Sequence, residues 1–261
     1  MGIILGCNAG IFSDVVSVVP RHTGCRSYRD ATDDIPKSWP GAAGATATLV
    51  SLRPRPDNLL SGALDDKILA LLAVASPGAA LTVWHEAGNL YQDFDFITPS
   101  SVRQMHVKMR NLCQQAGTGV GYGVCIYGTI AEMDKWIPHA PHAMDWYGID
   151  VYDNMNSNNG GTFRNASDAV DDSKINAYMD EFRDLARDRT GLTSPSINIP
   201  ECNSPILAHR PRFFRSLAEW LFDNGGRGMY TFFKDGGPSG GPWVPDDTAT
   251  IDALNHIANH P

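Results

Sequence analysis

Features that mark membrane, secreted and nucleic-acid-binding proteins are scarce in this 261-residue sequence. No run of about 18 apolar residues occurs, so the sequence predicts no membrane-spanning helix. The first ten residues carry no basic segment followed by a long apolar run, as a secretory signal peptide would. The formal net charge of −8 disfavours binding to nucleic acid or to an anionic membrane surface.

Motifs for a bound metal or cofactor are missing as well. None of the five cysteines forms a CxxC pair, and no histidines stand at zinc-binding spacing. The sequence also has no G-x-S-x-G motif and no glycine-rich phosphate loop after its first apolar run. We therefore expect neither metal nor cofactor. We interpret most of the cysteines as buried thiols and leave one disulfide open. They are Cys7, Cys25, Cys113, Cys125 and Cys202.

Short apolar runs alternate with longer amphipathic segments along the chain, which is the pattern of parallel βαβ units. Eight runs predict strands, and several of them are continuous and rich in β-branched or aromatic residues, as in strands that are buried on both faces. The predicted strands cover residues 3–6, 25–28, 46–52, 81–85, 121–127, 146–151, 196–199 and 228–233.

Five longer segments between these runs have helical spacing and recognisable ends. The clearest begins with Thr98-Pro99, a capping residue followed by proline, and stops at Gly117. The predicted helices cover residues 65–75, 98–116, 172–189, 211–223 and 247–259.

Eight strands with intervening helices predict a single-domain (β/α)8 barrel over residues 1–261, a fold that takes about 250 residues. The alternative is a doubly wound open sheet. We favour the barrel because no phosphate loop follows the first strand and because polar residues suited to chemistry stand at several strand ends. We expect the protein to be a monomer.

Two glutamates follow predicted strands on opposite sides of such a barrel. Glu86 follows the fourth strand and Glu201 follows the seventh. Side chains at the carboxyl ends of barrel strands reach its mouth, so the two carboxylates are predicted to face each other. Glycoside hydrolysis needs such a pair, with one acid to protonate the leaving oxygen and an opposed carboxylate to attack the anomeric carbon. Trp84 is an apolar neighbour that would raise the pKa of the acid.

Three segments carry a resemblance to a known family. Residues 83–89 (VWHEAGN) resemble the strand-four motif of the family 26 glycoside hydrolases, which belong to the clan A barrels. Residues 145–152 (DWYGIDVY) are similar to the sixth strand of that family, and residues 195–203 (PSINIPECN) to its seventh.

The resemblance implies a role for four side chains. Glu86 would be the catalytic acid/base and Glu201 the nucleophile of a retaining mechanism. His85 would orient the acid/base or bind the sugar, and Tyr152 would donate a hydrogen bond to the nucleophile. The family acts on β-linked mannans, xylans and glucans, so the implied partner is a β-linked polysaccharide or oligosaccharide.

Five further residues are candidates for contact with the sugar. Asp150 shares the face of its strand with the tyrosine two residues later. Asn8 and Arg53 end the first and third strands, where they could bind hydroxyl groups. Trp84 and Trp243 are aromatic platforms for an apolar sugar face, the latter in a loop rich in glycine and proline.

The sequence thus predicts a retaining glycoside hydrolase, with two alternatives left open. One is a barrel that binds carbohydrate without cleaving it, and the other is a hydrolase of another bond type, such as an amide or ester. The substrate class favours an extracellular location, although the sequence shows no signal peptide.

Overall fold

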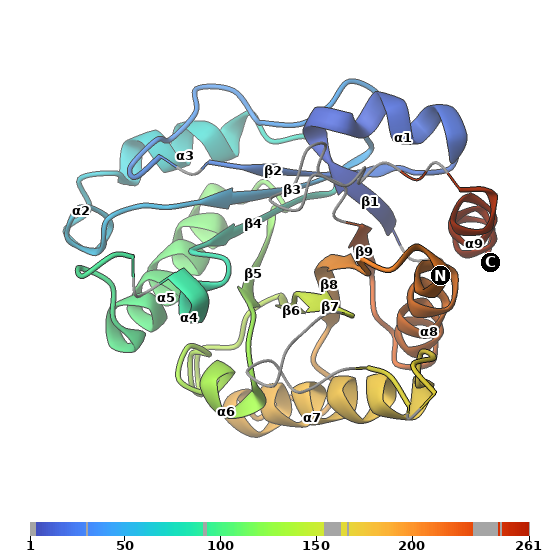
Figure 1. Cartoon of the computed structure of the whole chain (residues 1–261). Helices are drawn as coiled ribbons and strands as arrows, with labels where there is room; N and C mark the ends of the chain where they lie inside the picture. Colours follow the sequence, from blue (N-terminus) through green and yellow to red (C-terminus); the bar gives the residue numbers. More distant parts are fainter. Residues whose placement is uncertain are drawn as a thin grey trace.

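The computed structural model describes residues 4–29, 31–90, 93–153, 163–165, 167–231, 245 and 247–260, except the side chains of residues 89 and 90. Within these residues nine strands form one parallel sheet that curves into a ring (Figure 1). The strands are β1 (Ile4–Asn8), β2 (Gly24–Tyr28), β3 (Ala47–Leu52), β4 (Ala79–Val83), β5 (Gly121–Ile126), β6 (Trp146–Ile149), β7 (Val151–Tyr152), β8 (Ile197–Asn203) and β9 (Gly228–Thr231).

The ring is closed by hydrogen bonding between β6 and β8. The strands follow the order β6-β5-β4-β3-β2-β1-β9-β8-β7, and β6 also pairs with β8 at Tyr147↔Ile197 and Gly148↔Asn198. Only Asp150 separates β6 from β7, so these two strands share one of the eight positions in the ring. The predicted (β/α)8 barrel is confirmed, and the open sheet is wrong.

Helices surround the ring on its outside (Figure 1). The five predicted helices correspond to α3, α5, α7, α8 and α9, with ends within about two residues of those expected. The helices are α1 (Phe12–Val18), α2 (Pro56–Leu60), α3 (Asp65–Ala73), α4 (Ala87–Leu90), α5 (Pro99–Ala116), α6 (Ile130–Met133), α7 (Asp172–Thr190), α8 (Arg210–Asp223) and α9 (Thr248–Ala258), with short 3-10 helices η1 (Ala9–Ile11) and η3 (Leu207–His209).

Three strand ends differ from the prediction and carry residues of interest. β1 continues to Asn8, beyond the predicted end at residue 6. β4 ends at Val83 because Trp84 takes a left-handed backbone conformation with φ of 47°. β8 continues to Asn203, beyond the predicted end at residue 199, so Glu201 lies within a strand rather than after it. The register between β8 and β9 shifts between Ile199 and Cys202, as at a β-bulge, which changes where the following side chains point.

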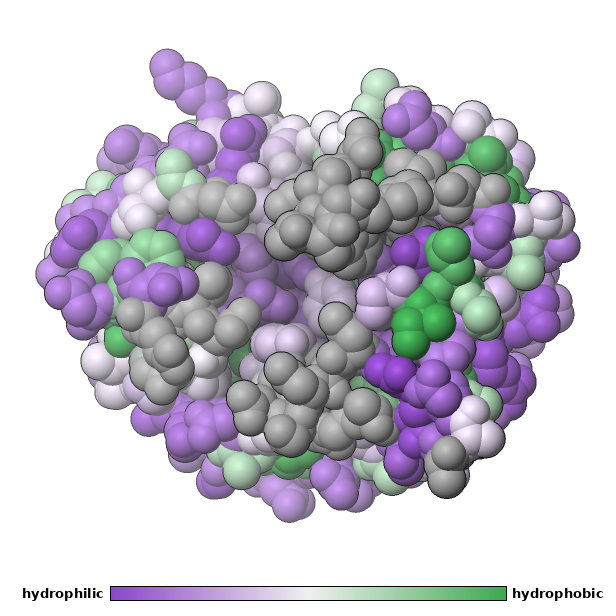
Figure 2. Space-filling view, viewed as in Figure 1, coloured by the Kyte–Doolittle hydropathy of each residue, from purple (hydrophilic) through white to green (hydrophobic). Residues whose placement is uncertain are grey.

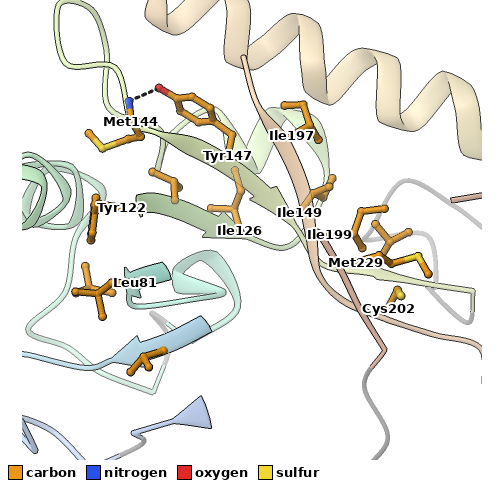
Figure 3. Packing of buried hydrophobic residues seen from close by; sticks show 14 of the residues in the cluster. Leu81, Tyr122, Ile126, Met144, Tyr147, Ile149, Ile197, Ile199, Cys202 and Met229 are labelled. Carbon is orange, nitrogen blue, oxygen red and sulfur yellow. Dashed lines mark hydrogen bonds between the residues drawn. The ribbon is translucent and has the colours of Figure 1, made fainter. Parts of the chain in front are cut away.

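The outward faces of the strands pack against the helices in one apolar layer. Figure 3 shows part of it, with Leu81 of β4, Ile149 of β6 and Met229 of β9 among the buried side chains. Tyr147 also lies in this layer, where its hydroxyl accepts a hydrogen bond of 2.7 Å from the backbone N–H of Met144. This layer anchors the ring from outside and leaves its interior for other residues.

Two aromatic rings fill part of the barrel interior where glycines make room for them. A Cβ on Gly123 would lie 2.1 Å from the Trp146 ring, and one on Gly6 would lie 2.2 Å from the Tyr230 ring. The two rings form a small buried cluster with Leu49 and Cys125. The interior is therefore packed rather than hollow at this level, as is usual in such barrels.

The five cysteines are all buried free thiols, so the disulfide that the sequence left open does not form. Burial raises the pKa of the Cys7 thiol to about 12, which keeps it protonated and unreactive. Among the helices that the structure describes, none is both long and apolar enough to cross a membrane.

Candidate active site

Three carboxylates from three parts of the chain meet in the barrel. An oxygen atom from each of Glu86, Asp150 and Glu201 lies within 4.8 Å of the other two. They follow or belong to β4, β6 and β8 respectively. A hollow with hydrophilic side chains opens at the centre of the face shown in Figure 2. The structure thus brings together the two glutamates that the sequence singled out.

Glu86 lies in the turn after β4, whose backbone is strained and is hydrogen-bonded to the neighbouring strands. Trp84 and Glu86 have φ of 47° and 55°, left-handed values that non-glycine residues rarely take. Backbone hydrogen bonds hold the turn to both neighbouring strands, from Trp84 N to Leu52 O at 2.9 Å and from Glu86 N to Cys125 O at 3.2 Å. Such conformations cost about 1–3 kcal/mol each and concentrate at functional sites.

Glu201 is held by three donors and is only 5% exposed. The Tyr28 hydroxyl donates to Oε1 at 2.5 Å, and Arg26 Nη1 lies 3.0 Å from the same oxygen. The Tyr152 hydroxyl donates to Oε2, as the family resemblance implies. Charge-assisted hydrogen bonds of this kind fix the orientation of a carboxylate strongly.

Arg26 lies beneath the glutamates as a fully buried cation. Its Nη1 is 3.3 Å from Asp150 Oδ1, and the Cys125 thiol donates to Asp150 Oδ2 at 3.2 Å. Burial and the neighbouring charge of Glu201 raise the pKa of Asp150 well above its ordinary value. Asp150 therefore ionises less readily than an exposed carboxyl group, although Arg26 acts in the opposite direction.

The phenols of the site remain protonated over a wide pH range. Burial raises the pKa values of Tyr28 and Tyr152 well above the ordinary value, and the charge of Glu201 adds to the effect. Burial, followed by the charge of Glu86, also raises the pKa of Tyr127 to about 12, and this ring packs edge-on against Tyr152 at 6.0 Å. Tyr28 and Tyr152 can therefore act as hydrogen-bond donors.

His85 stands beside Glu86 as a neutral imidazole. It is 5% exposed, and its ring packs edge-on against Tyr28 with 5.0 Å between centroids. Burial lowers the pKa of His85 well below its ordinary value, and the charges of Arg26 and Arg53 act in the same direction. Contact of His85 or Arg53 with a sugar stays a prediction.

Two of the predicted sugar contacts, Trp84 and Asp150, have side chains that are fully buried in the structure. Trp84 donates from Nε1 to the carbonyl oxygen of Pro54 at 2.7 Å and packs edge-on against Phe94 and Phe96. Asp150 also has no exposed surface, and one of its oxygens lies within 4.8 Å of an oxygen of each glutamate. Trp84 is a core residue, and Asp150 belongs to the support of the site.

The structure tests neither of two other predicted sugar contacts, Asn8 and Trp243. Asn8 caps η1, because its Oδ1 accepts a hydrogen bond of 2.8 Å from Gly10 N. A sugar contact by its remaining amide group stays a prediction. Trp243 lies outside the described residues.

Sequence reasoning missed Arg26 and Tyr28, although a signal for them existed. They stand two residues apart in β2 (GCRSY), so their side chains share one face of the strand and both project into the barrel. An arginine within a strand that is buried on both sides is rarely found without a carboxylate partner. That rule could have paired Arg26 with one of the two glutamates.

The three carboxylates could also supply enough oxygen ligands to hold a metal ion. The position of Arg26 shows whether a metal ion would fit there. Its guanidinium lies within 3.3 Å of Asp150 and within 3.0 Å of Glu201. A metal ion at the same oxygens would be repelled by this fixed positive charge. The residues present fit a site built for an arginine rather than for a metal.

Neither a family model nor a curated protein sequence matches this chain. Solved structures do match its fold. A GH26 β-mannanase from Bacteroides ovatus has a TM-score of 0.61 and 12% identity, over 99% of this chain and 88% of the other. Cel5A from Thermotoga maritima has a TM-score of 0.60 and 11% identity, over 96% of each chain.

A third match is a GH5 xyloglucan-specific endo-β-1,4-glucanase from a metagenomic library, with a TM-score of 0.58 and 14% identity, over 97% of this chain and 96% of the other. The chain has the fold of these barrels. At such identities the likeness concerns the backbone, and the chemistry must be argued from the side chains of this protein.

Proposed function

We propose that this protein is a retaining glycoside hydrolase that acts within chains of a β-linked polysaccharide of the mannan, xylan or glucan type. The observation that carries the proposal is the approach of Glu86 and Glu201, whose carboxylate oxygens lie within 4.8 Å. In retaining enzymes the two carboxyl groups are about 5–5.5 Å apart, whereas inverting enzymes separate them by about 6.5–9.5 Å to admit a water molecule.

The reaction proceeds in two balanced steps. Glu86 donates its proton to the glycosidic oxygen while a carboxylate oxygen of Glu201 forms a bond to the anomeric carbon, and the bond to the leaving oxygen breaks. Glu86, now a carboxylate, then takes a proton from water. The water oxygen bonds to the anomeric carbon and releases Glu201.

The surroundings of each glutamate support this division of roles. Glu201 is buried against the guanidinium of Arg26 and receives two phenolic hydrogen bonds, which suits a group that must act as a carboxylate. Glu86 is half-exposed on a turn at the mouth of the barrel, where a leaving group and a water molecule can reach it.

The comparisons support the substrate class. Matching folds belong to proteins described as a β-mannanase and as a xyloglucan-specific endo-β-1,4-glucanase. We propose that residues 1–261 act as one catalytic domain and as a monomer.

A panel of β-glycans, followed by NMR of the newly formed anomeric centre, tests the function. We expect hydrolysis with net retention, and loss of hydrolysis in Glu201→Gln. Net inversion would contradict the mechanism. Binding of a glycan without turnover would favour a non-catalytic carbohydrate-binding barrel, and sensitivity to chelators would favour a hydrolase of another type.

Azide distinguishes the two glutamates. Glu86→Ala should slow hydrolysis of a natural glycan by about 10²–10⁴-fold, the usual contribution of general acid–base catalysis. On an aryl β-glycoside with a good leaving group, azide should restore turnover and yield a β-glycosyl azide. Glu201→Ala with azide should instead yield the α-glycosyl azide, because azide then attacks in place of the nucleophile. The opposite stereochemistry would exchange the two roles.

A further inference from the structure

Tyr28 connects the nucleophile with the residue next to the acid/base. Its hydroxyl donates to Oε1 of Glu201 at 2.5 Å, and its ring packs against His85, which precedes Glu86. The guanidinium carbon of Arg26 also lies 4.7 Å from the centroid of this ring. Three neighbours, Glu201, His85 and Arg26, therefore contact Tyr28.

The two oxygens of Glu201 have different partners. Oε1 faces Tyr28 and Arg26, whereas Oε2 faces Tyr152. Among the described residues, Oε1 thus has two donors, one of them a buried cation, whereas Oε2 has the phenol of Tyr152.

We propose that Tyr28 is a positioning residue of the nucleophile that, with Arg26, holds Oε1 and leaves Oε2 as the attacking oxygen. This inference rests on the proposed function. Oε2 forms the bond to the anomeric carbon while the glycosidic bond breaks and the proton of Glu86 moves to the leaving oxygen. Oε1 becomes the carbonyl oxygen of the ester and still accepts the hydrogen bond of Tyr28, whereas Oε2 loses that of Tyr152.

Tyr28→Phe isolates the hydroxyl, because the ring that packs on His85 and Arg26 remains. A hydrogen bond to a charged group contributes about 1.5–3 kcal/mol, so we expect kcat/KM to fall about 10- to 100-fold. The acid limb of the pH profile should move to higher pH, because the carboxylate has lost a donor. A purely structural role would lower activity without moving that limb.

Tyr147→Phe is the matched control. It also removes a buried tyrosine hydroxyl, which accepts from Met144 N in the outer apolar layer. We expect its kcat/KM and pH profile to equal those of the unmodified protein. A Tyr28→Phe variant that behaves like Tyr147→Phe would overturn the role of Tyr28 and leave the proposed function intact.

Proton NMR of the Tyr28 hydroxyl provides a readout that does not need turnover. The short bond to Glu201 should give a far-downfield proton signal, absent in Tyr28→Phe and displaced in Glu201→Gln. Trapping the ester with a 2-deoxy-2-fluoro β-glycoside of the sugar identified by the panel should leave this proton hydrogen-bonded but move its signal upfield, as in Glu201→Gln, because the carbonyl oxygen of the ester is a neutral acceptor. Its loss on trapping would show that Oε1 attacks. A protein with the signal but with no glycosidase activity would overturn the proposed function, and with it this role.

Discussion

At the scale of single residues, Arg26 decides the character of the site. It is 1% exposed, and its guanidinium contacts Glu201 and Asp150. A buried charge is tolerated only when it is paired, because transfer out of water is costly. Arg26 and Glu201 therefore depend on each other, because each of these buried charges needs the other as its partner, and the arginine is a cation that does not titrate.

Arg26→Met should lower the free energy of unfolding by about 3–5 kcal/mol, because it leaves a buried carboxylate without its cation. The double variant Arg26→Met/Glu201→Gln should recover part of this loss, because it removes the buried negative charge as well. Urea denaturation of the two single variants and of the double variant measures the coupling.

Arg187→Met serves as the control for this experiment. Arg187 is 46% exposed and pairs with Asp184 at the surface of α7, so its removal should change stability by less than about 1 kcal/mol. Equal losses for Arg187→Met and Arg26→Met would contradict the claim that the buried pair matters.

At the scale of elements, β5 shows how glycines shape the interior of the barrel. Gly121 and Gly123 stand two residues apart on the same face of this strand. The Trp146 ring lies over Gly123, where a Cβ would come within 2.1 Å of it, whereas a Cβ on Gly121 would keep 3.7 Å.

Gly123→Ala should lower the free energy of unfolding by about 1–3 kcal/mol or more, because the added methyl group forces the indole ring out of its place. Gly121→Ala should change stability by less than about 1 kcal/mol, since its methyl group makes only ordinary contacts. Thermal denaturation of the two variants tests this prediction. Similar midpoints would show that the Trp146 ring can move aside at little cost in stability.

Element ends were harder to predict than elements. The α5 helix was predicted well because its signals are local: Thr98 and Ser101 form a capping box, and Gly117 ends the helix with φ of 63°. The ends of β4 and β8 were predicted wrongly, because a left-handed turn at Trp84 and a register shift before Cys202 arise from pairing with other strands.

At the scale of the whole molecule, buried histidines link stability to pH. Burial lowers the pKa of His106 to about 3 and that of His22 to about 4, from 6.5 in an exposed histidine. Below pH 6.5 these two histidines bind protons in the unfolded chain but stay neutral in the folded protein. Stability should therefore decrease as the pH falls from 6.5 toward these values, and these groups should have no effect above 6.5.

His106→Gln tests this linkage for one residue. Glutamine does not titrate and can still bond to the Tyr122 hydroxyl, which lies 2.7 Å from Nδ1 of His106. Between pH 6.5 and 5 the unmodified protein should lose about 2 kcal/mol more stability than the variant. Urea denaturation at a series of pH values measures the difference, and parallel curves would contradict a neutral buried His106.

The sequence by itself determined the class of fold and the two glutamates, because strand runs, helix caps and a carboxylate at a strand end are local patterns. Only the tertiary structure decided which side chains serve those glutamates. Tyr28 and Glu201 are 173 residues apart, and the sequence does not show that Trp84 and Asp150 are completely covered. Barrel closure and strand register set these contacts, and both depend on pairing between distant segments that no local pattern records.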